Sequence, residues 1–266
     1  MPAAYAHHTF GAACLETLPP KIKAICTKYR ELFDIGVHGP DVLFYYNPLS
    51  SNKVNSFGQE LHHWTGAQFF EVAKYSFQEN DDKQPMLAYL LGFLAHFTLD
   101  SSCHDYVNEE TEDSGLSHNL IESQYEVFLM EKDGKDPMEV DRSLPLKASA
   151  ENASIIARFF PFEEEEIRKA MKGQKTVLHL FYSPAEKKKK LVRGAIAKLK
   201  IKGDFSDLFL DREHLEECER MKEVLCLRQK AATELYPKLA KNLTLYLYDK
   251  GELDEYFTYD FEGELH

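Results

Sequence analysis

Apolar residues recur along most of this chain at steps of three and four, the spacing of helices, and no convincing alternation of apolar and polar residues predicts a strand. In the range 19–33, two prolines precede such a series, which ends at Phe33 and predicts a helix. The other predicted helices are 58–77, 84–107, a helix carrying His118 and Glu122, 147–160, 163–172, 184–199 and 211–248. The last range is either one long helix or two helices divided near Pro237.

Segments rich in glycine, proline and polar residues separate these helices. The range 36–52 is predicted to be a loop that can include one helical turn, and 109–115 is predicted to be a polar link between two helices. We therefore predict an all-α fold, a single-domain multi-helix bundle spanning 1–266. The metal-type residues fall within about 1–130, and a helical scaffold is expected over about 145–250.

Composition and charge narrow the function classes. The apolar content of 44% and charged content of 29% are ordinary for a globular protein, whereas the net charge of −12 argues against a nucleic-acid binder with a basic face. The five cysteines include no CxxC pair and are expected to be free thiols in a reducing compartment. No signal peptide is visible, and the apolar window 86–99 is too short for a membrane span. We therefore expect a cytoplasmic protein without a transmembrane segment, and nothing predicts its oligomeric state.

The most informative pattern is the series His96, Asp100 and His104, because each residue follows the last by four positions. On a helix, a step of four leaves successive side chains only about 40° apart, so all three share one stripe. Burying an ionised aspartate without a cation costs roughly several kcal/mol. No lysine or arginine occurs between Lys83 and Lys132 to form a local ion pair with Asp100. A metal ion is the expected partner.

A second pair, His118 and Glu122, repeats this spacing on the next predicted helix. Imidazole nitrogens and carboxylate oxygens that converge from two helices are typical ligands of Zn²⁺, so the pattern predicts a multinuclear metal site. Upstream, the pairs His7–His8 and His62–His63 each offer at most one ligand, since neighbouring side chains on a helix point in different directions. Asp41, in a Gly-Pro-Asp turn, is either a ligand or the cap of a helical turn.

Several motifs together resemble the zinc-dependent phospholipase C family, which includes bacterial phosphatidylcholine-hydrolysing enzymes. The motifs are AHHTFG, FDIGVHGPDVLFYYNPL, the region of His62, GFLAHFTLDSSCH and SHNLIESQYEVFL, and they cover about the first 130 residues. The combination of HxxxDxxxH with HxxxE is its most specific part.

The resemblance implies an all-α fold with a cluster of two or three zinc ions. The ligands that it implies are Asp41, His62, His96 and Asp100 for one zinc, His104, His118 and Glu122 for a second, and Asp100 with His7 for a third. The family's secreted enzymes complete the third site with a processed N-terminal tryptophan, whereas this chain begins Met1-Pro2. That departure leaves the third ion open.

The function predicted on this basis is metal-dependent phosphoester hydrolysis, in which a zinc-bound hydroxide attacks a phosphodiester and Asp41 is the candidate general base. The expected substrate is a phosphoester, with phospholipids among the candidates. Three alternatives remain: a nuclease or nucleotidase with the same zinc cluster, an HD-type phosphohydrolase built on His104 and Asp105, and a catalytically silent metal-binding protein. The HD alternative leaves His118 and Glu122 unexplained.

Overall fold

The computed structural model describes residues 3–182, 190–191, 194, 210 and 214–266. Within these residues the chain forms helices and two isolated β-bridges but no strand, which confirms the all-α fold class. The α-helices and 3-10 helices (η) are α1 (Ala4–Thr17), α2 (Pro20–Lys28), α3 (Arg30–Gly36), η1 (Gly39–Tyr45), α4 (Lys53–Leu61), α5 (Gly66–Glu79), α6 (Lys83–Ser114), α7 (His118–Lys132), α8 (Ala150–Ile156), η2 (Ala157–Phe159), α9 (Glu164–Phe181), η4 (Glu216–Cys218), α11 (Glu219–Leu247) and η5 (Glu255–Thr258). The predicted helix 184–199 lies largely outside the described residues.

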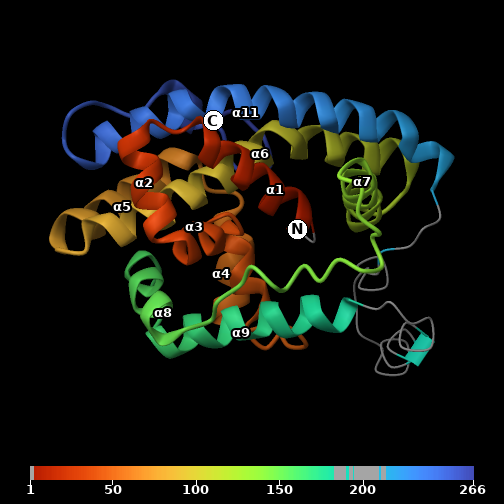
Figure 1. Ribbon diagram of the computed structural model, residues 1–266, viewed down its shortest axis with the longest axis horizontal. Coiled ribbons are helices and arrows are strands. Elements are labelled where there is room, and N and C mark those ends of the chain that lie inside the picture. Colours follow the sequence, from red (N-terminus) through yellow and green to blue (C-terminus); the bar gives the residue numbers. More distant parts are fainter. Residues whose placement is uncertain (1–2, 183–189, 192–193, 195–209, 211–213) are drawn as a thin grey trace.

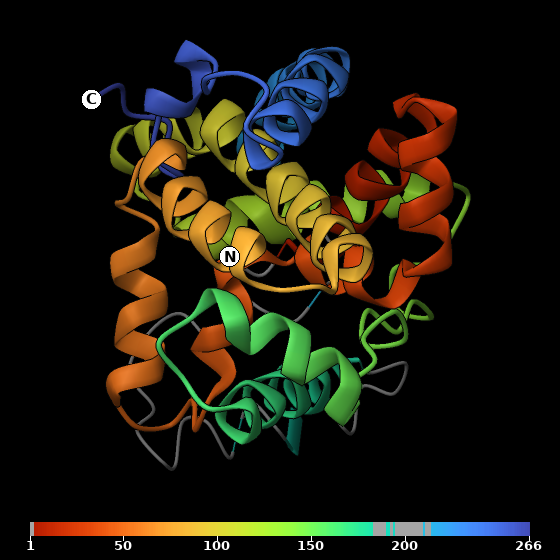
Figure 2. The ribbon, with the colours of Figure 1, turned by 90° about the vertical axis from the view of Figure 1, so that its left-hand side faces the viewer.

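Helix α6 runs through the middle of the molecule. In Figures 1 and 2 it lies between α11 on one side and the layer formed by α8 and α9 on the other. Helices α3 and α11 make its most extensive contacts. By length and composition α6 is the one helix in the described ranges that could cross a membrane, but 94% of its most apolar stretch is buried inside the fold. It is therefore accounted for as the core helix of the bundle.

Helix α6 is longer than the predicted range 84–107, so the prediction of a link over 109–115 is wrong. The helix continues to Ser114 and ends where Gly115 takes a left-handed conformation with φ of 73°. The prediction stopped where the apolar pattern stops, yet a polar, exposed helical extension needs no apolar stripe, and glutamate is a good helix former. Glycine just beyond the last turn is the more dependable stop signal. The extension places Asn108 on the same helix as His104.

Two other predicted helices are each broken in two. The range 19–33 divides at Tyr29 into α2 and α3. The range 58–77 divides between α4 and α5, where Thr65 caps α5 by accepting a hydrogen bond from the Gln68 N–H while the Gln68 side chain accepts one from the Thr65 N–H. Thr-x-x-Gln is a capping-box signal that the sequence carries. As a result His62 and His63 lie in a turn after α4, not within a helix.

The remaining predicted helices differ in extent. The range 147–160 holds α8 followed by η2, and the range 163–172 is the first part of a longer helix, α9. For 211–248, the described part contains one continuous helix, α11, with Pro237 inside it, so the alternative of two helices divided near this proline is wrong.

Close backbone contact between α3 and α6 fixes the segment that follows α3. A Cβ atom on Gly36 would lie 2.3 Å from the Tyr89 carbonyl oxygen, and one on Gly92 would lie 2.2 Å from the Phe33 carbonyl oxygen. Only glycine allows two helices to approach this closely. The crossing brings η1, which carries Asp41, against the part of α6 that carries His96.

Candidate metal centre

Helix α6 directs its predicted stripe into the interior. His96, Asp100 and His104 are all buried, and Asp100 lies between the two imidazoles. The Nε2 atom of His96 is 2.8 Å from Asp100 Oδ2, and the Nε2 atom of His104 is 3.6 Å from Asp100 Oδ1. Steps of four on one helix therefore bring these donors to a common point, as the spacing predicts.

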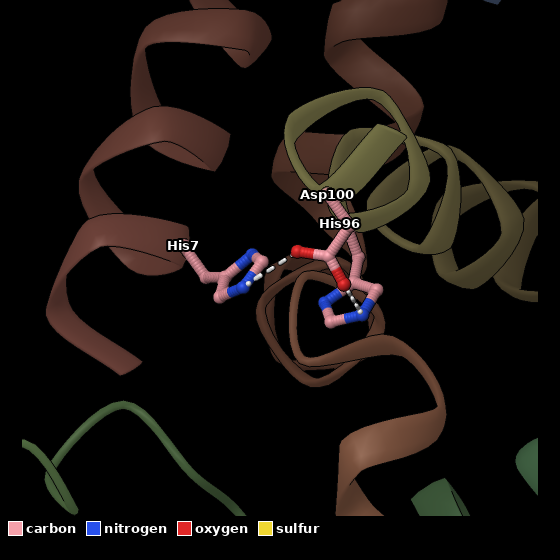
Figure 3. A group of neighbouring side chains, drawn as sticks. All are labelled: His7, His96 and Asp100. Atoms are coloured by element: carbon pink, nitrogen blue, oxygen red, sulfur yellow. Dashed lines mark ion pairs between the residues drawn. The ribbon is translucent and has the colours of Figure 1, made fainter. Parts of the chain in front are cut away.

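Helix α1 contributes His7 to the same point. Its Nε2 atom lies 3.2 Å from Asp100 Oδ1, and its ring stacks on that of His96 with centroids 4.4 Å apart. Figure 3 shows the Asp100 carboxylate held between the two imidazoles, which come from different helices. Burial is the main cause that lowers the pKa of the neighbouring His8, and the charge of Asp34 opposes this shift. Of the His7–His8 pair, the cluster contains His7.

Asp41 and His62 extend the cluster on its other side. The Nε2 atom of His62 lies 3.0 Å from Asp41 Oδ1, and the same oxygen lies 3.8 Å from His96 Nε2. No side chain caps η1, so the alternative role of Asp41 as a helix cap is wrong. His63, by contrast, is exposed. The structure thus separates the two members of the second histidine pair.

Helix α7 brings His118 and Glu122 to the His104 end of the cluster. Glu122 Oε1 lies 3.4 Å from His104 Nε2 and 3.2 Å from His118 Nε2. The His118 side chain is 27% exposed, whereas those of His104 and Glu122 are almost fully buried. This end is therefore the one nearest to solvent. All eight residues predicted as ligands form a single connected cluster, with Asp100 linking its two halves.

Four of the histidines are oriented by a hydrogen bond on the ring nitrogen that faces away from the cluster. When Nδ1 carries the proton of a neutral imidazole, the lone pair of Nε2 points inward, and metal-binding histidines are commonly held in this way. The four Nδ1 contacts are His62 to Gly58 O at 2.7 Å, His96 to Val37 O at 3.2 Å, His104 to Phe261 O at 2.9 Å and His118 to Asn108 Oδ1 at 3.1 Å.

Inside the cluster, several buried polar atoms lack a hydrogen bond. In the described part of the chain, His96 Nε2 and Asp100 Oδ2 have no hydrogen-bond partner, although they lie 2.8 Å apart. A buried lone pair opposite a carboxylate oxygen is unfavourable unless a proton or a cation lies between them. Donor atoms of this chemistry, gathered in three groups whose members lie within 4.8 Å of one another, fit divalent zinc.

The electrostatics of the cluster favour ionised carboxylates. Burial by itself would raise the pKa of Asp100, but the adjacent His104, His96 and His7 hold it well below its ordinary value. Burial would also raise the pKa of Glu122, but His118 and His104 help to hold it well below its ordinary range. Burial would lower the pKa of His104, yet Asp100 and Glu122 raise it to about 9. A metal ion bound to His104 would displace that proton, because histidine binds metal only as a neutral imidazole.

The HD-type alternative does not fit this arrangement. Asp105 lies outside the cluster, on the surface of α6, where its Oδ1 atom is 2.6 Å from Nη1 of Arg228. The one-residue step on the helix turns the side chain by roughly 100°, and here Asp105 faces Arg228 while His104 faces Asp100 and Glu122. His118 and Glu122, which that alternative leaves unexplained, are central to the cluster.

Sequence reasoning missed the residues that hold the clustered side chains in place from outside. Asn108 continues the stripe of His96, Asp100 and His104 by one more step of four, and this spacing could have identified it. The Phe261 carbonyl comes from the end of the chain, beyond the helical scaffold expected over about 145–250. Every residue has a carbonyl oxygen, so the sequence does not indicate which one accepts this hydrogen bond.

Comparison with known proteins identifies the family. A sequence model described as zinc-dependent phospholipase C matches residues 6–171, a range that is more than half of the chain and contains all eight clustered residues. No curated protein and no solved structure matches the chain. The fold is all-α and the cluster contains the histidines and carboxylates that zinc requires. The chain belongs to the zinc-dependent phospholipase C family, and its membership implies a hydrolase.

Proposed function

We propose that this protein hydrolyses a phosphodiester at a centre of two or three zinc ions. The proposed ligands are His7, Asp41, His62, His96, Asp100, His104, His118 and Glu122. The observation that carries the proposal is the single connected cluster that these residues form, with imidazole Nε2 atoms facing carboxylate oxygens.

The balance of charge supports metal ions at this position. Asp41 and Asp100 are buried, and in the described ranges neither forms an ion pair with a lysine or an arginine. Imidazoles neutralise them only in part: Asp100 and Glu122 raise the pKa of His104 to about 9, whereas burial lowers the pKa of His96 in spite of Asp100. Buried carboxylates that are not neutralised are costly. Divalent cations would compensate them and use the inward-facing nitrogens at the same time.

The chain's own residues set the chemistry. Bound zinc would polarise the phosphate oxygens and lower the pKa of water. We assign Asp41 as the proton acceptor: burial tends to raise its pKa, but the neighbouring His96 and His62 lower it, so the carboxylate is ionised at neutral pH. The partly exposed His118 marks the side from which a phosphoester would approach. A phospholipid is the substrate class that the family favours.

Asp100→Asn tests the proposal. Because Asp100 touches His7, His96 and His104, its replacement should lower the bound zinc by about one equivalent or more and abolish turnover of a chromogenic phosphodiester and of a chromogenic phosphocholine ester. Zinc content is measured by elemental analysis, and the activity of the unmodified protein should disappear with a chelator and return with zinc.

Asp105→Asn is the matched control, since Asp105 lies on the same helix but outside the cluster. It should keep both zinc and activity. Unchanged zinc stoichiometry in Asp100→Asn would refute the ligand assignment. Zinc without turnover on any phosphoester would instead favour a metal-binding protein that is catalytically silent.

A further inference from the structure

The end of the chain folds back against both halves of the metal cluster. The Phe261 N–H donates to the His62 carbonyl oxygen at 3.2 Å, and the Phe261 carbonyl accepts from His104 Nδ1 at 2.9 Å. The Phe261 ring also contacts His62 and His96. This segment lies ninety residues beyond the region matched by the family model, which ends at residue 171. The contacts therefore belong to this chain and not to the matched motif region.

The next residue, Glu262, reaches His118 through Asn108. Glu262 Oε2 accepts a hydrogen bond from Asn108 Nδ2 at 2.9 Å, and Asn108 Oδ1 lies 3.1 Å from His118 Nδ1. A carboxylate can only accept, so it fixes the amide with its nitrogen toward Glu262 and its oxygen toward His118. An amide oxygen in turn requires the proton on His118 Nδ1. Both hydrogen bonds therefore run in one direction: His118 donates to Asn108, and Asn108 donates to Glu262.

We propose that Glu262 is a positioning residue of the metal centre, acting through Asn108 to orient His118. The inference rests on the proposed function in one respect, that His118 is a zinc ligand. His118 is the most exposed of the imidazoles at this end, at 27%, so packing restrains it least and the hydrogen bond matters most. Partners of this kind in other metal sites typically change metal affinity by about 10- to 100-fold when they are removed.

The local backbone holds Glu262 in place independently of the metal centre. Asp260 Oδ1 accepts from the N–H groups of Glu262 and Glu264, at 3.0 and 2.8 Å, and Gly263 adopts a φ of 82°. Asp260 therefore shapes the turn, while the Glu262 side chain leaves the turn to reach Asn108. Replacing the Glu262 side chain should leave the turn intact.

The test is a zinc titration against a chromogenic chelator. Glu262→Ala and Asn108→Leu should each weaken the affinity for one zinc equivalent by about 10- to 100-fold, without a change in the thermal unfolding curve of the metal-free protein. Cobalt substituted for zinc should show an altered visible spectrum, since that spectrum reports the ligand geometry. Glu255→Ala is the matched control, because its side chain is exposed in η5, shortly before the same turn, and belongs to no cluster of metal-type residues.

A swapped pair separates positioning from general damage. Asn108→Asp combined with Glu262→Gln keeps one negative charge and reverses the donor and acceptor between the two residues, while His118 still meets an oxygen. This double variant should recover most of the affinity that Glu262→Ala loses. If the double variant binds zinc as weakly as Glu262→Ala, or if Glu262→Ala binds zinc as tightly as Glu255→Ala, the inference is overturned. If the unmodified protein binds no zinc at all, the proposed function fails as well.

Discussion

Replacing Arg142 with methionine should destabilise the protein, and the loss should grow as the pH rises. Arg142 Nη1 lies 2.6 Å from Glu126 Oε2, and the two side chains are only 3% and 0% exposed. The other oxygen of Glu126 accepts a hydrogen bond from the N–H of Tyr5, in the first turn of α1. The buried ion pair thus fixes the start of the helix that carries His7. Methionine retains much of the arginine's apolar stem while removing the charge.

The size of the effect follows from burial. Removing one partner of a buried ion pair costs about 3–5 kcal/mol. The Tyr5 N–H remains as a donor to Glu126, so we expect the lower end, about 3 kcal/mol at neutral pH. For a chain of this size, each kcal/mol lowers Tm by about 2–4 °C, so the expected fall is about 10 °C.

The pH dependence comes from Glu126. Burial raises the pKa of this carboxyl above its ordinary value, and Arg142 opposes that shift, so the pKa should rise further once Arg142 is gone. The unfolded carboxyl then loses its proton at a lower pH than the folded one. Rising pH therefore favours the unfolded state until the folded pKa is passed. The variant should be closest to the unmodified protein in acid and should fall furthest below it at and above neutral pH.

The assay is denaturant unfolding of the metal-free protein at a series of pH values from about 4 to 8, a window that starts near the ordinary pKa of glutamate. Glu126→Gln added to Arg142→Met removes the buried charge, so it should recover most of the lost stability and abolish the extra pH dependence. A loss that is the same at every pH would mean that Arg142 acts through packing alone. Failure of the second substitution to recover stability would refute the account as well.

Two further predictions concern the cluster. His62→Ala should lose zinc and activity, whereas His63→Ala should keep both, because His62 contacts Asp41 and His63 is exposed. The reverse result in metal analysis and turnover would contradict the assignment. Gly39→Ala should lower zinc affinity, because Gly39 has a φ of 50° and an added Cβ would lie 2.2 Å from Cδ2 of the His96 ring. Its control is Gly134→Ala, where φ is 70° and no atom lies within 4 Å of the added Cβ. Both should lose about 1–2 kcal/mol from backbone strain, and equal zinc affinity in the two variants would rule out the contact with His96.

The ligand stripe could be predicted because its information is local. Four-residue steps place side chains on one face of any helix, whatever surrounds it, and His96, Asp100 and His104 needed only that rule. Helix limits were less accessible. The apolar stripe continues across the breaks at Tyr29 and before Thr65, so periodicity joined separate helices. A capping box marks the correct limit at Thr65, whereas no side chain caps the helix that begins after Tyr29.

The supports of the ligands depend on contacts that no local rule reaches. Phe261 accepts from His104 through a carbonyl oxygen, an atom that every residue has, across 157 positions of sequence. The position of Asn108 could have been predicted, because it follows His104 by four residues. Its hydrogen bond to Glu262, at the far end of the chain, could not. A fragment ending at residue 171 would hold all eight clustered residues, yet it would lack the Phe261 carbonyl that accepts from His104 and the Glu262 carboxylate that accepts from Asn108. The residues that cluster can therefore be predicted from a motif, whereas the contacts that orient them come from the whole chain; that 1–266 forms a single domain stays a prediction.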